Sequence, residues 1–172
     1  MSPVPPKKSR TSAPPVSDGP GAEAVNPLSL DAQLCFLLYS STHAMVKVYK
    51  PVLDELGLTY PQYLVMLLLW EAEGWTVNAL GDRLGLDSGT LTPLLRRMAI
   101  KGLLTRTRDL ADERRVQVNV SEAGLALKAR AGIVPEAMRC ALGLEDAELQ
   151  AMRATLADLQ RRLKLGAIAA SR

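Results

Sequence analysis

The chain has 172 residues, a formal net charge of +3 and a mean hydropathy of +0.05. This length is sufficient for one domain with its own hydrophobic core, and the hydropathy is that of an ordinary soluble globular protein. The longest apolar run, Leu64–Trp70, is too short to span a bilayer, and the N-terminus lacks the apolar core of a secretory signal, so we expect a cytoplasmic protein.

Few residues are available for metal or hydrolytic chemistry. The chain has two cysteines, Cys35 and Cys140, roughly a hundred positions apart, and a single histidine. A metal site needs closer and more numerous ligands, and a hydrolytic triad needs a histidine with suitable partners. We therefore expect no metal, no cofactor and no enzymatic activity. Because structural disulfides are uncommon in a reducing cytosol, the two thiols are predicted to be either inert core residues or redox-active groups.

The N-terminal part predicts a disordered tail followed by two helices. Residues 1–26 contain six of the eleven prolines and cannot bury enough apolar area to offset their ordering entropy. From about residue 28 to 56 the apolar residues repeat with the 3.6-residue period of a helix, which we expect Pro51 to kink or interrupt. A second helix, almost uniformly apolar and hence buried, is predicted from Thr59–Pro61 to Gly74.

A pair of short helices follows. The first is predicted over 77–84, and after a tight turn Asp87 or Ser88 caps the second, in which Pro93 should cause a local irregularity. In that second helix the residues expected to face the core are Leu91, Leu94, Leu95 and Met98. Its outer face then carries hydroxyl and arginine side chains: Ser88, Thr90, Thr92, Arg96 and Arg97. Such a pair is typical of a helix-turn-helix, although helix pairs of this kind also occur as plain scaffold.

Two strands, 103–106 and 115–120, are predicted to form a β-hairpin directly after this helix pair, with a polar tip at 107–114. Between residues 96 and 115 the chain has seven bases and three acids, a charge of +4 on an otherwise near-neutral protein. This distribution indicates a polyanionic partner, and the hairpin reads as a wing that reaches the minor groove of DNA. The wing residues expected at DNA are Arg108, Asp112, Arg114 and Arg115, with Asp112 orienting Arg114 through an ion pair.

The C-terminal part predicts a helix over about 121–142, interrupted near Pro135, and an amphipathic helix over 145–165. The apolar stripes of these helices and of the first helix need a partner, which a twofold dimer supplies. We therefore expect a mainly α fold with a small β-hairpin wing, a dimeric winged helix-turn-helix. Residues 27–172 form one domain, with the winged unit at about 59–120 and dimerisation helices at about 28–56 and 121–165.

Several runs, read together, resemble the MarR family of winged helix-turn-helix regulators. Asp112-x-Arg114 followed by Val120-Ser121-x-x-Gly124 resembles that family's wing-to-helix signature. More narrowly, the chain is similar to the organic hydroperoxide sensors of the family, the OhrR type, in its two-cysteine branch. The runs that carry this likeness are Gln33–Tyr39, Tyr49–Pro51, Leu58–Tyr63 and Leu86–Leu95, and the resemblance extends over roughly residues 28–165.

The resemblance implies a repressor that binds operator DNA as a homodimer and releases it when an organic hydroperoxide oxidises Cys35. It implies that Tyr49 and Tyr60 hydrogen-bond to the Cys35 thiol and that Cys140 of the other subunit forms a disulfide with it. Phe36 and Tyr39, beside Cys35, are expected to form an apolar peroxide pocket. Tyr49 follows Cys35 by fourteen residues, roughly 21 Å of continuous helix, so we expect the tyrosine to reach the thiol across the dimer.

Two alternatives stay open. In one, a MarR-type repressor releases DNA when it reversibly binds a small phenolic ligand, and Cys35 is incidental. In the other, Cys35 and Cys140 serve a thiol peroxidase, a reading that leaves the helix-turn-helix and the basic wing without a role.

Overall fold

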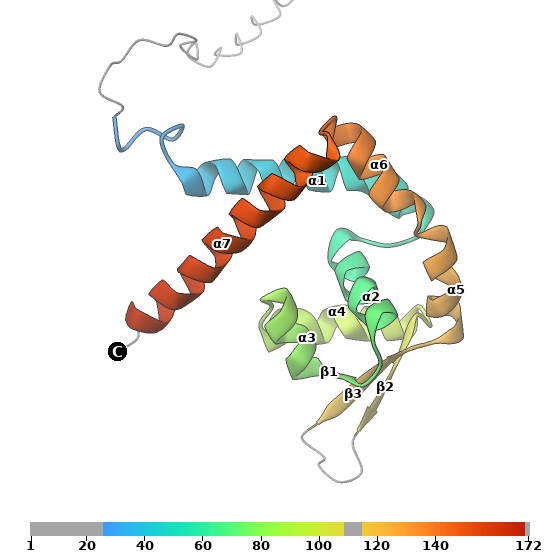
Figure 1. Ribbon diagram of the computed structural model, residues 1–172. Helices are drawn as coiled ribbons and strands as arrows, with labels where there is room; N and C mark the ends of the chain where they lie inside the picture. The colour runs from blue at the N-terminus through green and yellow to red at the C-terminus, as the bar shows by residue number, and fades with distance from the viewer. Residues whose placement is uncertain (1–25, 109–114, 171–172) are drawn as a thin grey trace, which may run out of the picture. The chain divides into compact units, whose positions relative to one another are not determined.

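The computed structural model describes residues 26–108 and 115–170 (Figure 1). Residues 1–25 of the predicted tail and 109–114 of the predicted wing tip, with Asp112 and Arg114, lie outside the described residues, whereas Thr107 and Arg108 of that tip belong to a strand. The chain divides at Tyr39–Ser40 into two compact units. The elements in chain order are α1 (Leu34–Glu55), α2 (Tyr60–Glu71), β1 (Trp75–Thr76), α3 (Val77–Leu84), α4 (Ser88–Ile100), β2 (Leu104–Arg108), β3 (Val116–Val120), α5 (Glu122–Arg130), α6 (Ile133–Leu142) and α7 (Asp146–Ala170).

The first unit shows that the predicted start of the first helix, at about residue 28, is too early. Turns precede α1, in which the Leu28 N–H donates to Asn26 Oδ1 (3.0 Å) and the Gln33 amide donates to the Ser29 carbonyl (3.4 Å). These local side-chain bonds compete with helical hydrogen bonding and delay the helix. Further along, α1 continues through Pro51, so the predicted interruption does not occur. Pro51 and Lys47 are both exposed, and water can satisfy the Lys47 carbonyl that the missing N–H leaves.

In the second unit, α2 is the central helix, as predicted. Six of its residues are buried, and Val65 and Met66 have no exposed surface. At its start the Gln62 side chain accepts the N–H of Thr59 at 3.0 Å, which satisfies one backbone donor at the helix entrance. Around α2 the core is formed by buried residues of α1, α3, α4, β2 and β3, among them Leu53, Leu80, Leu91, Leu95, Met98, Leu104 and Val118.

The helix pair α3–α4 forms as the sequence predicts. Thr76 caps α3 by accepting the Ala79 N–H at 3.2 Å, and Asp87 caps α4 by accepting the Thr90 N–H at 2.9 Å. Between them Gly85 adopts φ +67°, the left-handed conformation that ends α3. Helix α4 runs through Pro93 without interruption.

The sheet has one strand more than predicted. The short strand β1 pairs with β3, which also pairs with β2, so the antiparallel order is β1-β3-β2. The register places Trp75, Val118 and Arg106 opposite one another in one row across the three strands. Two residues give too short a pattern for period-2 alternation to reveal β1 in the sequence.

After the wing, the predicted helix over 121–142 is two helices, α5 and α6. The break falls at Ala131–Gly132 and precedes Pro135, which lies in the first turn of α6, where a proline needs no N–H donor. The last helix, α7, continues to Ala170, five residues beyond its predicted end at 165. In the described part of the chain, no helix is both long and apolar enough to cross a membrane.

Candidate DNA interface and candidate thiol site

The outer face of α4 carries the side chains predicted to meet DNA. The residues of this face, all exposed, are Ser88, Thr90, Thr92, Arg96 and Arg97. The opposite face is buried against the core, with Leu91, Leu94, Leu95 and Met98 at most 5% exposed. The helical spacing therefore sorted these residues correctly between core and surface.

Asp87 at the start of α4 has two bonds to Thr90. Its carboxylate accepts the Thr90 backbone N–H at 2.9 Å and the Thr90 hydroxyl at 3.0 Å, and these bonds lower the pKa of Asp87 below its usual value. Asp87 is therefore ionised at neutral pH, and an ionised carboxylate can only accept. The Thr90 hydroxyl proton is thus directed to Asp87, which leaves this hydroxyl as an acceptor toward any ligand.

At the wing, Arg108 ends β2 and Arg115 immediately precedes β3, and both are exposed. Arg108 pairs with Val116 in the strand register, so these residues mark the last described pair before the tip. Asp112 and Arg114, the predicted minor-groove pair, lie in the part of the wing that the structure does not describe.

A pocket of about 210 Å³ lies between the start of α3, the start of α4 and the base of the wing. Two of its residues, Arg106 and Asn78, were not among the predicted site residues. The sequence held one signal for Arg106: strand alternation puts it on the face of Leu104, which is 2% exposed, where an apolar residue is expected. The lining residues are Thr76, Val77, Asn78, Ser88, Thr92, Arg106, Arg115 and Val116.

The two thiols lie in different units. In the first unit Cys35 is exposed near the start of α1, followed by half-buried Phe36, and Tyr39 is 62% exposed. In the second unit Cys140 is exposed near the end of α6. Both cysteines are free thiols, and exposure makes each accessible to an oxidant or to another thiol.

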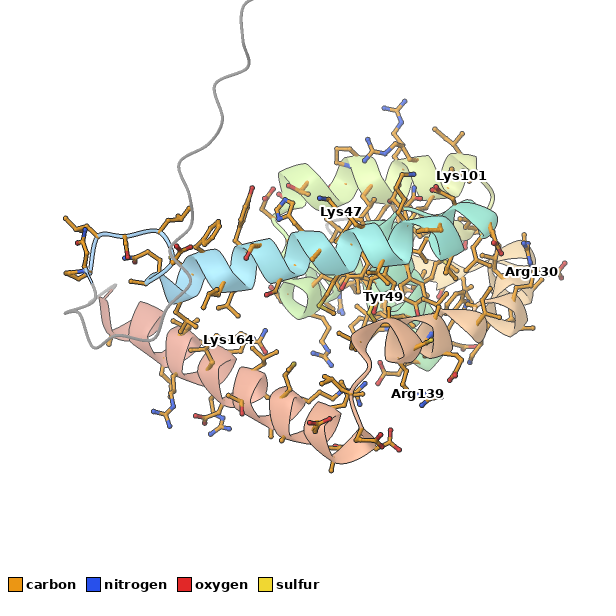
Figure 2. All side chains as sticks on the ribbon, turned by 90° about the horizontal axis from the view of Figure 1, so that it is seen from above. Lys47, Tyr49, Lys101, Arg130, Arg139 and Lys164 are labelled. Atoms are coloured by element: carbon orange, nitrogen blue, oxygen red, sulfur yellow. The ribbon has the colours of Figure 1, made fainter. Side chains whose placement is uncertain are left out.

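The structure brings the two predicted thiol-activating tyrosines together. The ring of Tyr49 on α1 (labelled in Figure 2) lies 4.9 Å from that of Tyr60 at the start of α2, and 6.1 Å from that of Tyr63. Burial raises the pKa of Tyr49, with Tyr60 and Tyr63 adding to the rise and Arg153 opposing it. Burial also raises the pKa of Tyr63, again with a contribution from Tyr60. The Tyr49 phenol therefore keeps its proton at neutral pH and can donate a hydrogen bond.

A mainly apolar pocket of about 250 Å³ adjoins Tyr60. Lys50 and Asp54, both exposed, form a 2.6 Å ion pair among its lining residues. The other lining residues are Val46, Leu53, Leu58, Thr59, Tyr60 and Pro61.

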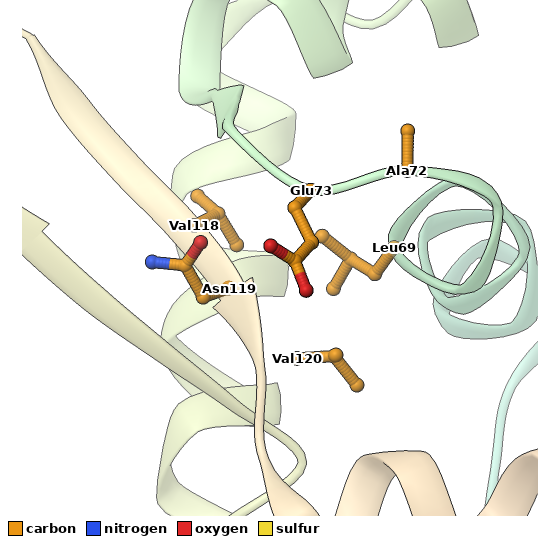
Figure 3. A pocket seen from close by; sticks show the side chains of 6 residues that line it. All are labelled: Leu69, Ala72, Glu73, Val118, Asn119 and Val120. Carbon is orange, nitrogen blue, oxygen red and sulfur yellow. The ribbon is translucent and has the colours of Figure 1, made fainter.

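A further pocket, of about 210 Å³, lies between the end of α2 and β3 (Figure 3). Leu69, Val118 and Val120 form its apolar part, the Glu73 carboxylate points into it, and Asn119 borders it. One carboxylate and one amide give no set of groups suited to metal or acid–base chemistry, and we assign this pocket no role.

The C-terminal end of α1 is bound by cations from two other helices. Lys101, at the end of α4, donates to the Gly57 carbonyl at 2.8 Å, and Arg130, at the end of α5, donates to the Glu55 carbonyl at 2.9 Å (Figure 2). Carbonyls at a helix C-terminus lack intrahelical partners, so the Arg130 bond satisfies an acceptor that α1 leaves open, whereas Lys101 binds the turn that follows the helix. Lys101 connects α4, which carries the candidate DNA-facing side chains, to the turn after α1, and Arg130 connects α5 to the end of α1.

Comparison with known proteins finds transcriptional regulators. A family model described as transcriptional regulator SarA/Rot matches residues 47–130. The organic hydroperoxide resistance transcriptional regulator of Bacillus subtilis is 55% identical over 108 residues, which cover 63% of this chain and 74% of that protein.

Solved structures agree. Reduced AbfR bound to DNA, a protein of Staphylococcus epidermidis, superposes with a TM-score of 0.69 at 34% identity, over 78% of this chain and 92% of that one. A MarR-family transcriptional regulator from Rhodococcus sp. RHA1 gives a TM-score of 0.69 at 25% identity, over 77% of this chain and 95% of that one. The chain, with its helix pair, three-stranded sheet and wing, belongs to the MarR family of winged helix-turn-helix transcriptional regulators.

Proposed function

We propose that this regulator is a peroxide-responsive repressor: a homodimer that binds operator DNA and releases it when an organic hydroperoxide oxidises Cys35. Two observations together carry the proposal: the chain is 55% identical to an organic hydroperoxide resistance regulator, and its Cys35 thiol is exposed. A purely structural cysteine at this position would more often be buried.

DNA binding uses the outer face of α4 in the major groove and the wing in the minor groove. The hydroxyls and Arg96 and Arg97 contact the operator from the helix, and Arg108, Arg114 and Arg115 contact it from the wing. Thr90 accepts from a base amino group, because its own proton is held by Asp87 and a phosphate oxygen has no proton to give.

The partner of the exposed apolar side chains is a second copy of the chain. Helix α7 presents Met152, Leu156 and Leu163 at 48%, 44% and 62% exposure. In the first unit Leu34 and Leu37 are 57% and 52% exposed. Surfaces of this kind are costly to leave in water, and a twofold interface between the N- and C-terminal helices covers them in both copies at once.

The signalling reaction consumes one peroxide per oxidised thiol. The Cys35 thiolate attacks the terminal oxygen of ROOH, the O–O bond breaks, and the products are a Cys35 sulfenic acid and the alcohol ROH after protonation. The Cys140 thiol of the other subunit then attacks the sulfenic sulfur, forming a disulfide and releasing water. The disulfide changes the dimer, and with it the spacing of the two α4 helices that the operator requires.

Tyr49 and Tyr60 stabilise the Cys35 thiolate by donating hydrogen bonds to it from the other subunit. Fourteen residues of helix separate Cys35 from Tyr49 in one chain, which is why the pairing is intersubunit. A hydrogen bond to a charged group contributes about 1.5–3 kcal/mol, so Tyr49→Phe should slow peroxide reduction roughly 10- to 100-fold. Tyr63→Phe, in the same aromatic cluster, is the matched control and should leave the rate unchanged.

The proposal is tested by a gel shift on the DNA upstream of the protein's own gene, with and without an organic hydroperoxide. Wild-type protein should bind when reduced and release DNA when treated, and a non-reducing gel should show a dimer band that Cys140→Ser abolishes. A monomeric oxidised wild type would count against the intersubunit disulfide, and retained peroxide response in Cys35→Ser would refute the role of the thiol.

The pocket beside Tyr60 favours a second candidate function, release of DNA by a reversibly bound phenolic ligand. Its apolar lining suits an aromatic ring, and the Lys50 ammonium can donate a hydrogen bond to a polar substituent of the ring. In that case Cys35→Ser leaves the response to the inducer intact. A thiol peroxidase, the remaining alternative, would show sustained turnover with a dithiol reductant and no sequence-specific DNA binding.

A further inference from the structure

The side chain of Arg106 points the wrong way for an ordinary wing residue. In β2 it shares a face with Leu104, and across the sheet it lies opposite Val118, which has no exposed surface, and in row with Trp75. A guanidinium keeps its charge under all conditions in a protein. A charge on an apolar row is expected to have an ion partner or hydrogen-bond acceptors there.

The Arg106 Nε has no such acceptor. Over residues 26–108 and 115–170 it is the one buried side-chain nitrogen or oxygen without a hydrogen-bond partner. Buried polar groups are almost always satisfied, and an exception calls for a ligand or a functional reason. The residue also lines the pocket between α3, α4 and the wing, so an acceptor can reach the guanidinium from there.

The rest of that pocket is suited to an anion. None of its eight described lining residues is acidic, and besides Arg106 it contains Arg115, the Asn78 amide and the hydroxyls of Ser88 and Thr92. Every one of these groups can donate a hydrogen bond. The neighbouring carboxylate of Asp87 is already engaged by Thr90.

We propose that this pocket seats one phosphate of the DNA backbone, with Arg106 as its main ligand and Asn78 as a second. The proposal rests on the DNA binding proposed above and adds a contact that fixes the position of the protein on the duplex. In a helix-turn-helix the first helix crosses the backbone while the second enters the major groove, and the pocket lies where α3 and α4 both begin. A phosphodiester in the pocket supplies acceptors to the guanidinium of Arg106, whose Nε has no hydrogen-bond partner among the described residues of the protein.

The decisive experiment replaces operator phosphates one at a time with neutral methylphosphonates and measures binding by fluorescence anisotropy. Wild-type protein should lose affinity at a set of positions in each half-site. Arg106→Met should bind the unmodified operator more weakly than wild type. At one of those positions a methylphosphonate should cause no further loss of affinity in this variant, and at the other positions the loss should equal that of wild type. The slope of log Kobs against log[salt] should fall by about one for each Arg106 that contacts DNA.

Two measurements separate this role from a structural one. Because the methionine side chain needs no hydrogen bond, Arg106→Met should melt no lower than wild type in the absence of DNA. Arg161→Gln, which removes an exposed arginine of α7, should keep the full phosphate pattern and salt slope. If the methionine variant does not fold, Arg106→Lys serves instead, and it should weaken the response at the same single phosphate.

The outcomes distinguish the two proposals. A wild-type protein that binds a scrambled duplex as tightly as the operator would refute the proposed function. If wild-type protein prefers the operator and Arg106→Met shows the same methylphosphonate pattern as wild type, only the proposed phosphate site is refuted. A lowered melting temperature with unaltered DNA binding in Arg106→Met would likewise make Arg106 a structural residue.

Discussion

Removing the two cations that bind the end of α1 should loosen the connection between that helix and the DNA-binding unit. Lys101 and Arg130 donate to the Gly57 and Glu55 carbonyls at 2.8 and 2.9 Å. Both side chains are exposed, so after solvent screening each bond contributes about 0.5–1 kcal/mol. The double variant Lys101→Met/Arg130→Met should lose roughly 1–2 kcal/mol, although the two acceptors are close enough for the losses to be coupled.

Two assays follow this loss. For a chain of this size, 1–2 kcal/mol lowers Tm by roughly 3–6 °C in a calorimetric scan. If α1 carries the signal from Cys35, the ratio of the operator Kd after oxidation to that before oxidation should also fall, by about fivefold for each 1 kcal/mol of lost coupling. Lys128 is the matched control, because it donates to the Trp70 carbonyl at 2.9 Å and so connects α5 to the end of α2.

Lys128→Met should therefore lower Tm by an amount similar to that of either single variant and leave the Kd ratio at the wild-type value. The reasoning is wrong if the double variant melts like wild type. If the double variant is destabilised and still releases DNA on oxidation as completely as wild type, the two bonds stabilise the fold but do not transmit the signal from Cys35.

Three further outcomes are expected. Gly124→Ala should cost about 2 kcal/mol and lower Tm by roughly 4–8 °C, because the added Cβ would overlap the backbone carbonyl of Leu103, just before β2. Gly132→Ala, where an added Cβ meets only ordinary contact at 3.7 Å, should be neutral. The pKa of Asp87 is lowered in the folded state, so its stabilising effect is complete above its unfolded pKa of about 3.9 and is lost as the pH falls through the lower folded pKa. The urea midpoint of Asp87→Asn should therefore vary less with pH across that range than the midpoint of wild type. Arg114→Ala should weaken operator binding in a gel shift without changing the rate at which peroxide consumes Cys35, and an unchanged operator affinity would refute its place in the wing.

Much of the fold could be predicted because its signals are local and periodic. The inward set of α4, Leu91, Leu94, Leu95 and Met98, follows from helical spacing alone, and the caps Thr76 and Asp87 are residue types that favour helix starts. The predictions that failed for the helices also have local physical causes. Pro51 and Pro93 remain inside helices on exposed faces, where water can satisfy the carbonyl that the missing N–H leaves open.

The candidate site was harder to predict where it depends on tertiary contacts. Arg106 appeared as one base among several in a charged stretch, and only the pairing of β2 with β3 shows that it faces Val118. The bonds from Lys101 and Arg130 to the end of α1 join residues 44 and 75 positions apart, which no local pattern can reveal. Tyr49 and Tyr60, in contrast, were predicted from the resemblance; the structure adds that their ring centroids lie 4.9 Å apart, and their action on Cys35 stays a prediction.

The central claim is that oxidation of Cys35 by an organic hydroperoxide releases the operator. The most direct measurement is a titration of the operator-bound protein with an organic hydroperoxide, which follows DNA release by anisotropy and the state of Cys35 by mass spectrometry in the same samples. We predict that release is complete near one equivalent of peroxide per subunit and tracks the loss of the Cys35 thiol, whereas Cys35→Ser stays bound. Release that requires no change at Cys35, or that proceeds equally in Cys35→Ser, would contradict the account.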